Sequence, residues 1–221
     1  MSTQRTVVYI GGRGHVAKLA TPKLVAAGHT VTSVIRRPEQ ADEVTALGAT
    51  ALVQDITALD RAGWEELLAP ADVVVWGAGN GGRGGPEITQ AVDRDAALQM
   101  IDALEALGER APRLLMISYR NATRNTAPDD GGTWHAYVEA KKAVDLRLGR
   151  SSVPHLILGP GMLTDEPARG VRVVPDDDSE QPEAHTSREL VADVLTEMVG
   201  RDHLPAGPLA FLDGDDPVSG I

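Results

Sequence analysis

The fold of this chain is decided by the stretch Val7-Val8-Tyr9-Ile10-Gly11-Gly12-Arg13-Gly14-His15-Val16-Ala17. A β-branched apolar run predicts a buried strand, and it leads directly into a glycine-rich turn and a helical pattern. Glycine lacks a Cβ, so such a turn lets the backbone approach a pyrophosphate, whose charge meets the free N–H groups and dipole of the next helix. Gly11, Gly14 and Ala17 occupy the three key positions. The stretch therefore predicts the start of a dinucleotide-binding unit.

The bulk composition is that of an ordinary globular protein, with 221 residues, 42% hydrophobic and 24% charged. We predict one domain over residues 1–221, with a nucleotide-binding core at 1–158 and a substrate-side extension at 159–221. The absence of cysteine excludes a disulfide framework and a cysteine nucleophile. No apolar run approaches the ~20 residues of a membrane span, so we expect a cytoplasmic protein without a membrane partner. The net charge of −11 disfavours nucleic acid as a partner, because nucleic acid is itself a polyanion.

Short β-branched runs alternate with longer helical stretches, which is typical of a parallel sheet covered on both faces. The expected strands are 6–10, 30–35, 50–53, 72–76, 113–117, 154–158 and 209–212, and the expected helices are 16–27, 38–47, 61–68, 87–107, 134–148 and 187–199. The prediction is an α/β fold with a doubly wound parallel sheet and a short C-terminal extension.

The first turn also supplies Gly12, Arg13, His15 and Val16 as predicted cofactor contacts. Its spacing can be read as Gly-x-x-Gly-x-x-Ala from Gly11 or as Gly-x-Gly-x-x-Ala from Gly12, and the sequence leaves this open.

The residues that determine cofactor preference are expected at the end of the second strand, about 20 residues beyond the glycines. A carboxylate at this place would select a free ribose 2′-hydroxyl. Arg36 and Arg37 stand there instead. Guanidinium groups suit a 2′-phosphate, so we predict that NADPH is preferred over NADH. The alternative is that both arginines are solvated surface charges.

A second glycine cluster, Gly77, Ala78 and Gly79, follows the fourth expected strand. We expect its backbone to pass close to the adenosine half of the cofactor, with Asn80 to Gly85 as a mobile flap. Asp55, just after the third strand, is predicted near the adenine. The alternative for Asp55 is a role in a local turn.

The candidate catalytic residues are Ser118, Tyr137 and Lys141. Tyr137 and Lys141 are four apart on an expected helix and share one face, and Ser118 follows the fifth strand. An ammonium near a phenol lowers its pKa, so Tyr137 would exchange a proton, while Ser118 would hydrogen-bond the acceptor oxygen. The alternative is a structural pair.

These motifs, together with the segment from Gly159 to Pro167, resemble an atypical short-chain dehydrogenase/reductase of the compact NmrA-like and epimerase-like group. The resemblance implies a Rossmann fold, with Ile56 beside the adenine and Lys141 on the nicotinamide ribose. It also implies that Pro160, Met162 and Leu163 pass the nicotinamide. Ala17 departs from the usual third glycine, and Gly159 stands where many relatives have arginine.

The leading hypothesis is an NADPH-dependent oxidoreductase that reduces a small carbonyl or quinone-type substrate. The substrate pocket is expected between Tyr119 to Thr126, Trp134 and the loop after Leu163. The alternatives are a non-catalytic NADP(H)-binding redox sensor and a flavin or quinone reductase with direct hydride transfer. A sugar-nucleotide epimerase is disfavoured by the short length. No histidine spacing indicates a metal site, and we expect a monomer or homodimer.

Overall fold

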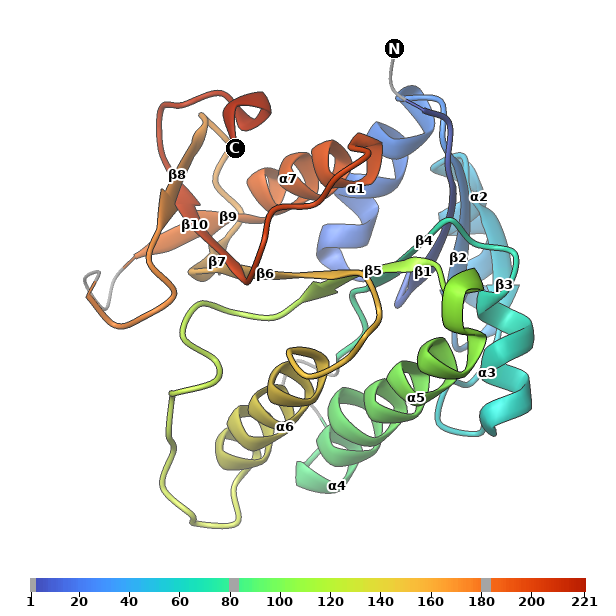
Figure 1. Ribbon diagram of the computed structural model, residues 1–221, viewed down its shortest axis with the longest axis horizontal. Coiled ribbons are helices and arrows are strands. Elements are labelled where there is room, and N and C mark those ends of the chain that lie inside the picture. Colours follow the sequence, from blue (N-terminus) through green and yellow to red (C-terminus); the bar gives the residue numbers. More distant parts are fainter. Residues whose placement is uncertain (1–2, 80–83, 180–183) are drawn as a thin grey trace.

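The computed structural model describes residues 3–79, 84–179 and 184–221, and within them eight strands form one sheet (Figure 1). In sheet order they are β3 (Thr50–Val53), β2 (Thr30–Ile35), β1 (Thr6–Ile10), β4 (Val73–Trp76), β5 (Arg113–Ile117), β6 (His155–Pro160), β10 (Leu209–Asp213) and β8 (Val171–Val174). All neighbours are parallel except β10 and β8. The order reverses beside β1, as in a doubly wound fold. The predicted fold class is confirmed.

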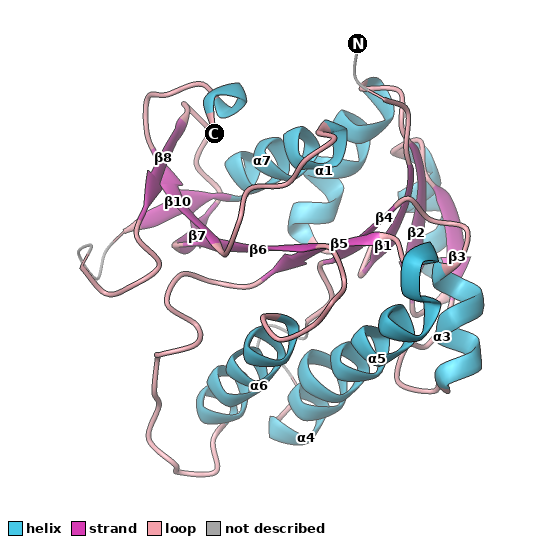
Figure 2. Ribbon diagram, viewed as in Figure 1, coloured by secondary structure: helices cyan, strands magenta, loops and turns pink. Residues whose placement is uncertain are grey.

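Helices cover both faces of the sheet (Figure 2). Helices α1 (His15–Ala26) and α7 (Arg188–Gly200) pack together on one face, and α5 (Ala97–Leu107) and α6 (Thr133–Leu148) lie on the other. The remaining helices are α2 (Ala41–Ala46), α3 (Arg61–Leu68), α4 (Pro86–Thr89) and the 3₁₀ turns 38–40, 108–110 and 218–220. Within the described residues, no helix combines the length and apolar character needed to cross a membrane.

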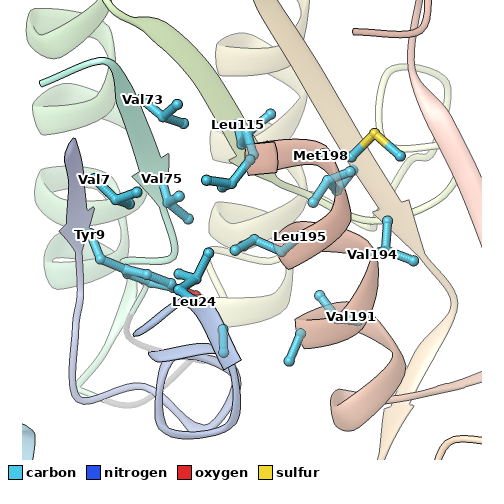
Figure 3. Packing of buried hydrophobic residues seen from close by; sticks show 14 of the residues in the cluster. Val7, Tyr9, Leu24, Val73, Val75, Leu115, Val191, Val194, Leu195 and Met198 are labelled. Carbon is cyan, nitrogen blue, oxygen red and sulfur yellow. The ribbon is translucent and has the colours of Figure 1, made fainter. Parts of the chain in front are cut away.

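The alternation of side chains along β1 divides the core into two layers. Val7 and Tyr9 face the α1–α7 layer, where they belong to the same cluster as Leu24 and Leu195 (Figure 3). Val8 and Ile10 belong to the opposite cluster under α3 and α5. Because β1 is buried on both faces, the turn that follows it has a rigid base.

Two departures from the expected elements lie near the site. The single helix expected over 87–107 is divided into α4, a π-helical segment (Gln90–Ala96) and α5. Three short strands were not expected: β8, β7 (Met162–Thr164) and β9 (His185–Ser187), of which β7 and β9 pair in a separate two-stranded sheet. Most of the flap expected over 80–85 lies outside the described residues.

Candidate functional site

The glycine turn after β1 is closely packed against β2 and the segment that follows β4. Gly11 has φ +84°, and a Cβ there would lie 2.7 Å from the backbone of Ala78. A Cβ on Gly12 would lie 2.4 Å from Cβ of Ser33. These contacts favour glycine at both positions, because a Cβ at either would force the neighbouring chain to shift.

Helix α1 begins directly after this turn, with Gly14 at its N-cap and no side chain capping its N-terminus. The first turn of α1 has no acidic residue. The free N–H groups and dipole of this helix therefore suit a phosphate, in agreement with the close-packed glycines.

A cavity of about 620 Å³ lies at the carboxyl ends of β1 to β4. Of the predicted cofactor residues it is lined by Gly11, Arg13, Gly14, His15, Arg36, Arg37, Asp55, Ile56, Gly77, Ala78 and Gly79. The other predicted contacts, Gly12, Val16, Lys141, Pro160, Met162 and Leu163, are outside its lining. Gly12 is buried against β2, and Val16 packs on the α1–α7 core. The structure thus gathers most of the predicted set around one cavity.

The rim of this cavity is basic. Arg36 and Arg37 are exposed after β2, and Arg13 and Lys18 both pair with Glu43 of α2, the Arg13 Nε to Glu43 Oε2 distance being 2.5 Å. Hydrogen bonds from Lys18 and Arg13 lower the pKa of the Glu43 carboxyl. Sequence reasoning missed Glu43, because only the fold brings α2 next to the glycine turn.

Asp55 forms a local turn in which its carboxylate accepts hydrogen bonds from the Thr57 N–H and hydroxyl at 3.0 and 2.7 Å. These bonds and the nearby Arg36 lower the Asp55 pKa. The turn role that was the alternative for Asp55 is therefore present, and the same residue also lines the cavity.

The three candidate catalytic residues gather at the end of β5. Lys141 is buried and donates from Nζ to the carbonyl oxygen of Ile117 at 3.0 Å, directly before Ser118. Tyr137 lies one helical turn earlier on α6 and stacks with the rings of Tyr119 and Trp134, with centroids 5.8 and 5.7 Å away. The expected helix face and strand end are thus brought together.

One expectation about Tyr137, that its pKa is lowered, is wrong. Burial raises the pKa of the Tyr137 phenol, and the carboxylates of Asp93 and Asp145 raise it further. The lowering of the Tyr137 pKa that was expected from Lys141 does not prevail, because the Lys141 ammonium is directed to the Ile117 carbonyl. Tyr137 is consequently a protonated phenol at neutral pH.

Two buried carboxyl groups near Tyr137 were missed by sequence reasoning. Asp145 lies on α6 and accepts a hydrogen bond from Ser118 Oγ at 2.5 Å. Asp93 lies in the π-helical segment, where a Cβ on Gly79 would come 2.8 Å from its carboxylate. Asp145 follows Lys141 by four residues, so the same spacing that paired Tyr137 with Lys141 was an available signal.

The loop after Ser118 is held against the loop after β8. The Asn121 N–H donates to the Asp176 carboxylate at 2.7 Å, and Arg120 donates to the Asp177 carbonyl. Trp134 is 57% exposed beside Tyr137. These residues border the predicted substrate side.

The comparisons with known proteins agree with this geometry. Residues 11–202 match a family model described as NAD(P)H-binding. The chain belongs to this NAD(P)H-binding family. The family match supports a nicotinamide cofactor, and the resemblance to the short-chain dehydrogenase/reductase group is confirmed at the level of fold.

Individual relatives of this NAD(P)H-binding protein have diverse descriptions. A UPF0659 protein of Schizosaccharomyces pombe is 34% identical over 74% of this chain and 72% of its own length. The uncharacterised sugar epimerase YhfK of Bacillus subtilis is 27% identical over 96% of both chains. A Bacillus halodurans structure, provisionally described as an NAD-dependent epimerase/dehydratase, is 29% identical with a TM-score of 0.85, over 98% of this chain and 97% of its own.

Proposed function

We propose that this protein is an NADPH-dependent reductase of a small carbonyl or quinone-type compound. The observation that supports it best is that Ser118, Tyr137 and Lys141 gather at the end of β5, in the same sheet edge as the glycine-turn cavity. A bound nicotinamide would supply the hydride there.

The roles of the three residues follow from their surroundings. The protonated phenol of Tyr137 is the proton donor, because a product alkoxide is far more basic than a phenolate even where burial raises the phenol pKa. Ser118 hydrogen-bonds the acceptor oxygen as negative charge develops on it. Lys141, held by the Ile117 carbonyl, orients the ribose and supplies positive charge.

The preference for NADPH is supported by the basic rim. Arg36 and Arg37 line the cavity and are exposed, so their guanidinium groups can turn toward a 2′-phosphate. Arg13 is held by Glu43 on the same rim and would close the phosphate site from the other side.

The test is oxidation of NADPH by the purified protein against aldehydes, dicarbonyls, quinones and free flavins. Tyr137→Phe should lower turnover of a carbonyl acceptor by at least about a hundredfold, the range of general acid catalysis, and leave NADPH binding unchanged. Tyr9→Phe is the matched control, because it removes a hydroxyl from the core rather than from the site. Full activity in Tyr137→Phe would contradict the proton-donor role and favour direct hydride transfer to a quinone or flavin.

An epimerase is the second candidate, favoured by the descriptions of the Bacillus subtilis and Bacillus halodurans relatives. An epimerase returns the hydride to its substrate and causes no net change in nicotinamide absorbance. Net NADPH oxidation with an acceptor would therefore exclude it for that substrate. Tight cofactor binding with neither reaction would instead support a redox sensor.

A further inference from the structure

The hydroxyl of Ser118 is already committed to a buried partner. Its Oγ donates to Asp145 Oδ2 at 2.5 Å, and both residues are buried, with exposed fractions of 6% and 3%. A serine hydroxyl has a single hydrogen to donate. While Asp145 is ionised and accepts that hydrogen, Ser118 offers only lone pairs to a carbonyl oxygen, which is itself an acceptor. The ionised pair therefore opposes the role given to Ser118 above.

The surroundings of Asp145 favour its neutral form. Burial raises the pKa of this carboxyl to about 6, Asp176 raises it as well, and the Ser118 hydrogen bond and the Lys141 ammonium only partly oppose the effect. The second oxygen, Oδ1, is buried and accepts no hydrogen bond from any residue that the structure describes. Among the described residues, Asp145 thus has one oxygen bound to Ser118 and one without a hydrogen-bond partner.

A second cavity, of about 550 Å³, borders Asp145. Besides Asp145, the charged residues in its lining are Arg124, Arg150, Asp176 and Asp177. It shares no lining residue with the glycine-turn cavity. Asp145 can therefore exchange a proton through the second cavity, which Tyr119, Thr123 and Arg124 of the predicted substrate loop also line, while the cofactor occupies the glycine-turn cavity.

We propose that protonation of Asp145 directs the Ser118 hydroxyl, which makes Asp145 a positioning residue for the reduction. A protonated carboxyl donates to Ser118 Oγ and releases the serine hydrogen toward the substrate oxygen. An ionised carboxylate holds the serine hydrogen and withdraws it from the substrate. This inference rests on the proposed function, because it assigns Ser118 the task of polarising a carbonyl.

The first test is the pH dependence of kcat/KM for a carbonyl acceptor in the wild type and in Asp145→Asn. The wild type should lose activity above about pH 6, by about tenfold per pH unit. In Asp145→Asn an amide N–H donates to Ser118 at every pH. The alkaline limb of the pH profile, which is the fall in kcat/KM above about pH 6, should therefore disappear between pH 5 and 8. Asp176→Asn is the matched control: the limb should remain and move to lower pH, because a like charge near Asp145 is gone. A wild-type limb that persists unchanged in Asp145→Asn would overturn the proposal.

The second test does not need turnover. Infrared difference spectra of the wild type should show a carboxyl that titrates near pH 6, is absent in Asp145→Asn, and titrates at higher pH in Ser118→Ala. The titration midpoint of Asp145 should rise in Ser118→Ala because the Ser118 hydroxyl stabilises the ionised carboxyl in the wild type. An unchanged midpoint in Ser118→Ala would overturn the coupling. Absence of turnover with every acceptor would contradict the proposed function, and the infrared result would then decide the coupling alone.

Discussion

Replacing Asp145 with Asn should change how the stability of this protein depends on pH. Burial raises the Asp145 pKa from its ordinary 3.8 to about 6, so between these values the folded protein holds a proton that the unfolded chain has released. Stability then falls as pH rises, since the folded state binds more protons. At about 1.4 kcal/mol per pH unit, the fall amounts to about 2 kcal/mol between pH 4 and 8, because part of the change lies below pH 4.

Urea unfolding of both proteins from pH 4 to 8, followed by tryptophan fluorescence, measures this change. Trp64 and Trp76 are fully buried with ring centroids 6.2 Å apart, so their emission reports loss of the core. The unfolding free energy of Asp145→Asn minus that of the wild type should rise by about 2 kcal/mol across the range, because all other titrating groups are common to both. Asp215→Asn, at an exposed carboxylate, is the matched control. A flat difference for Asp145→Asn would refute the burial argument.

Three further substitutions test the cofactor rim and the core. Arg36→Asp should weaken NADPH binding by at least about tenfold and NADH binding by less than about twofold in fluorescence titrations, and an equal loss for both would show that Arg36 does not contact the 2′-phosphate. Gly12→Ala should lower the unfolding free energy by about 1 to 3 kcal/mol in urea, because its Cβ would meet Ser33 at 2.4 Å; unchanged stability would contradict the packing. Tyr9→Phe should raise that free energy by about 1 kcal/mol, because the buried hydroxyl has no hydrogen-bond partner among the described residues, and a loss would point to an undetected partner.

The central sheet was predictable because its information is local. The runs of β-branched residues in β1, β2 and β3 predict strands with the bounds that the structure shows. The glycine turn after Ile10 fixes where the cofactor cavity forms. By contrast, β7, β8 and β9 have three or four residues each, and they form through pairing with distant segments, such as β8 with β10. Their sequences alone contain too little pattern to predict them.

In the candidate site, too, some features follow from local sequence and others depend on contacts between distant segments. The Tyr137–Lys141 spacing and the position of Ser118 place these residues by local rules. The Asp145 bond to Ser118 and the approach of Glu43 to Arg13 depend on packing between elements that are far apart in sequence. The pKa of Tyr137 likewise depends on burial, which outweighs the charge of Lys141 that the sequence suggested.

The most direct test of the account is equilibrium binding of NADPH and NADH to the wild-type protein, followed by the fluorescence of the reduced nicotinamide. The account predicts saturable binding of both cofactors at one site, with NADPH at least about tenfold tighter because Arg36 and Arg37 meet the 2′-phosphate. Equal affinities or tighter binding of NADH would contradict the role of the basic rim. Binding of neither cofactor would contradict the assignment of the glycine-turn cavity itself.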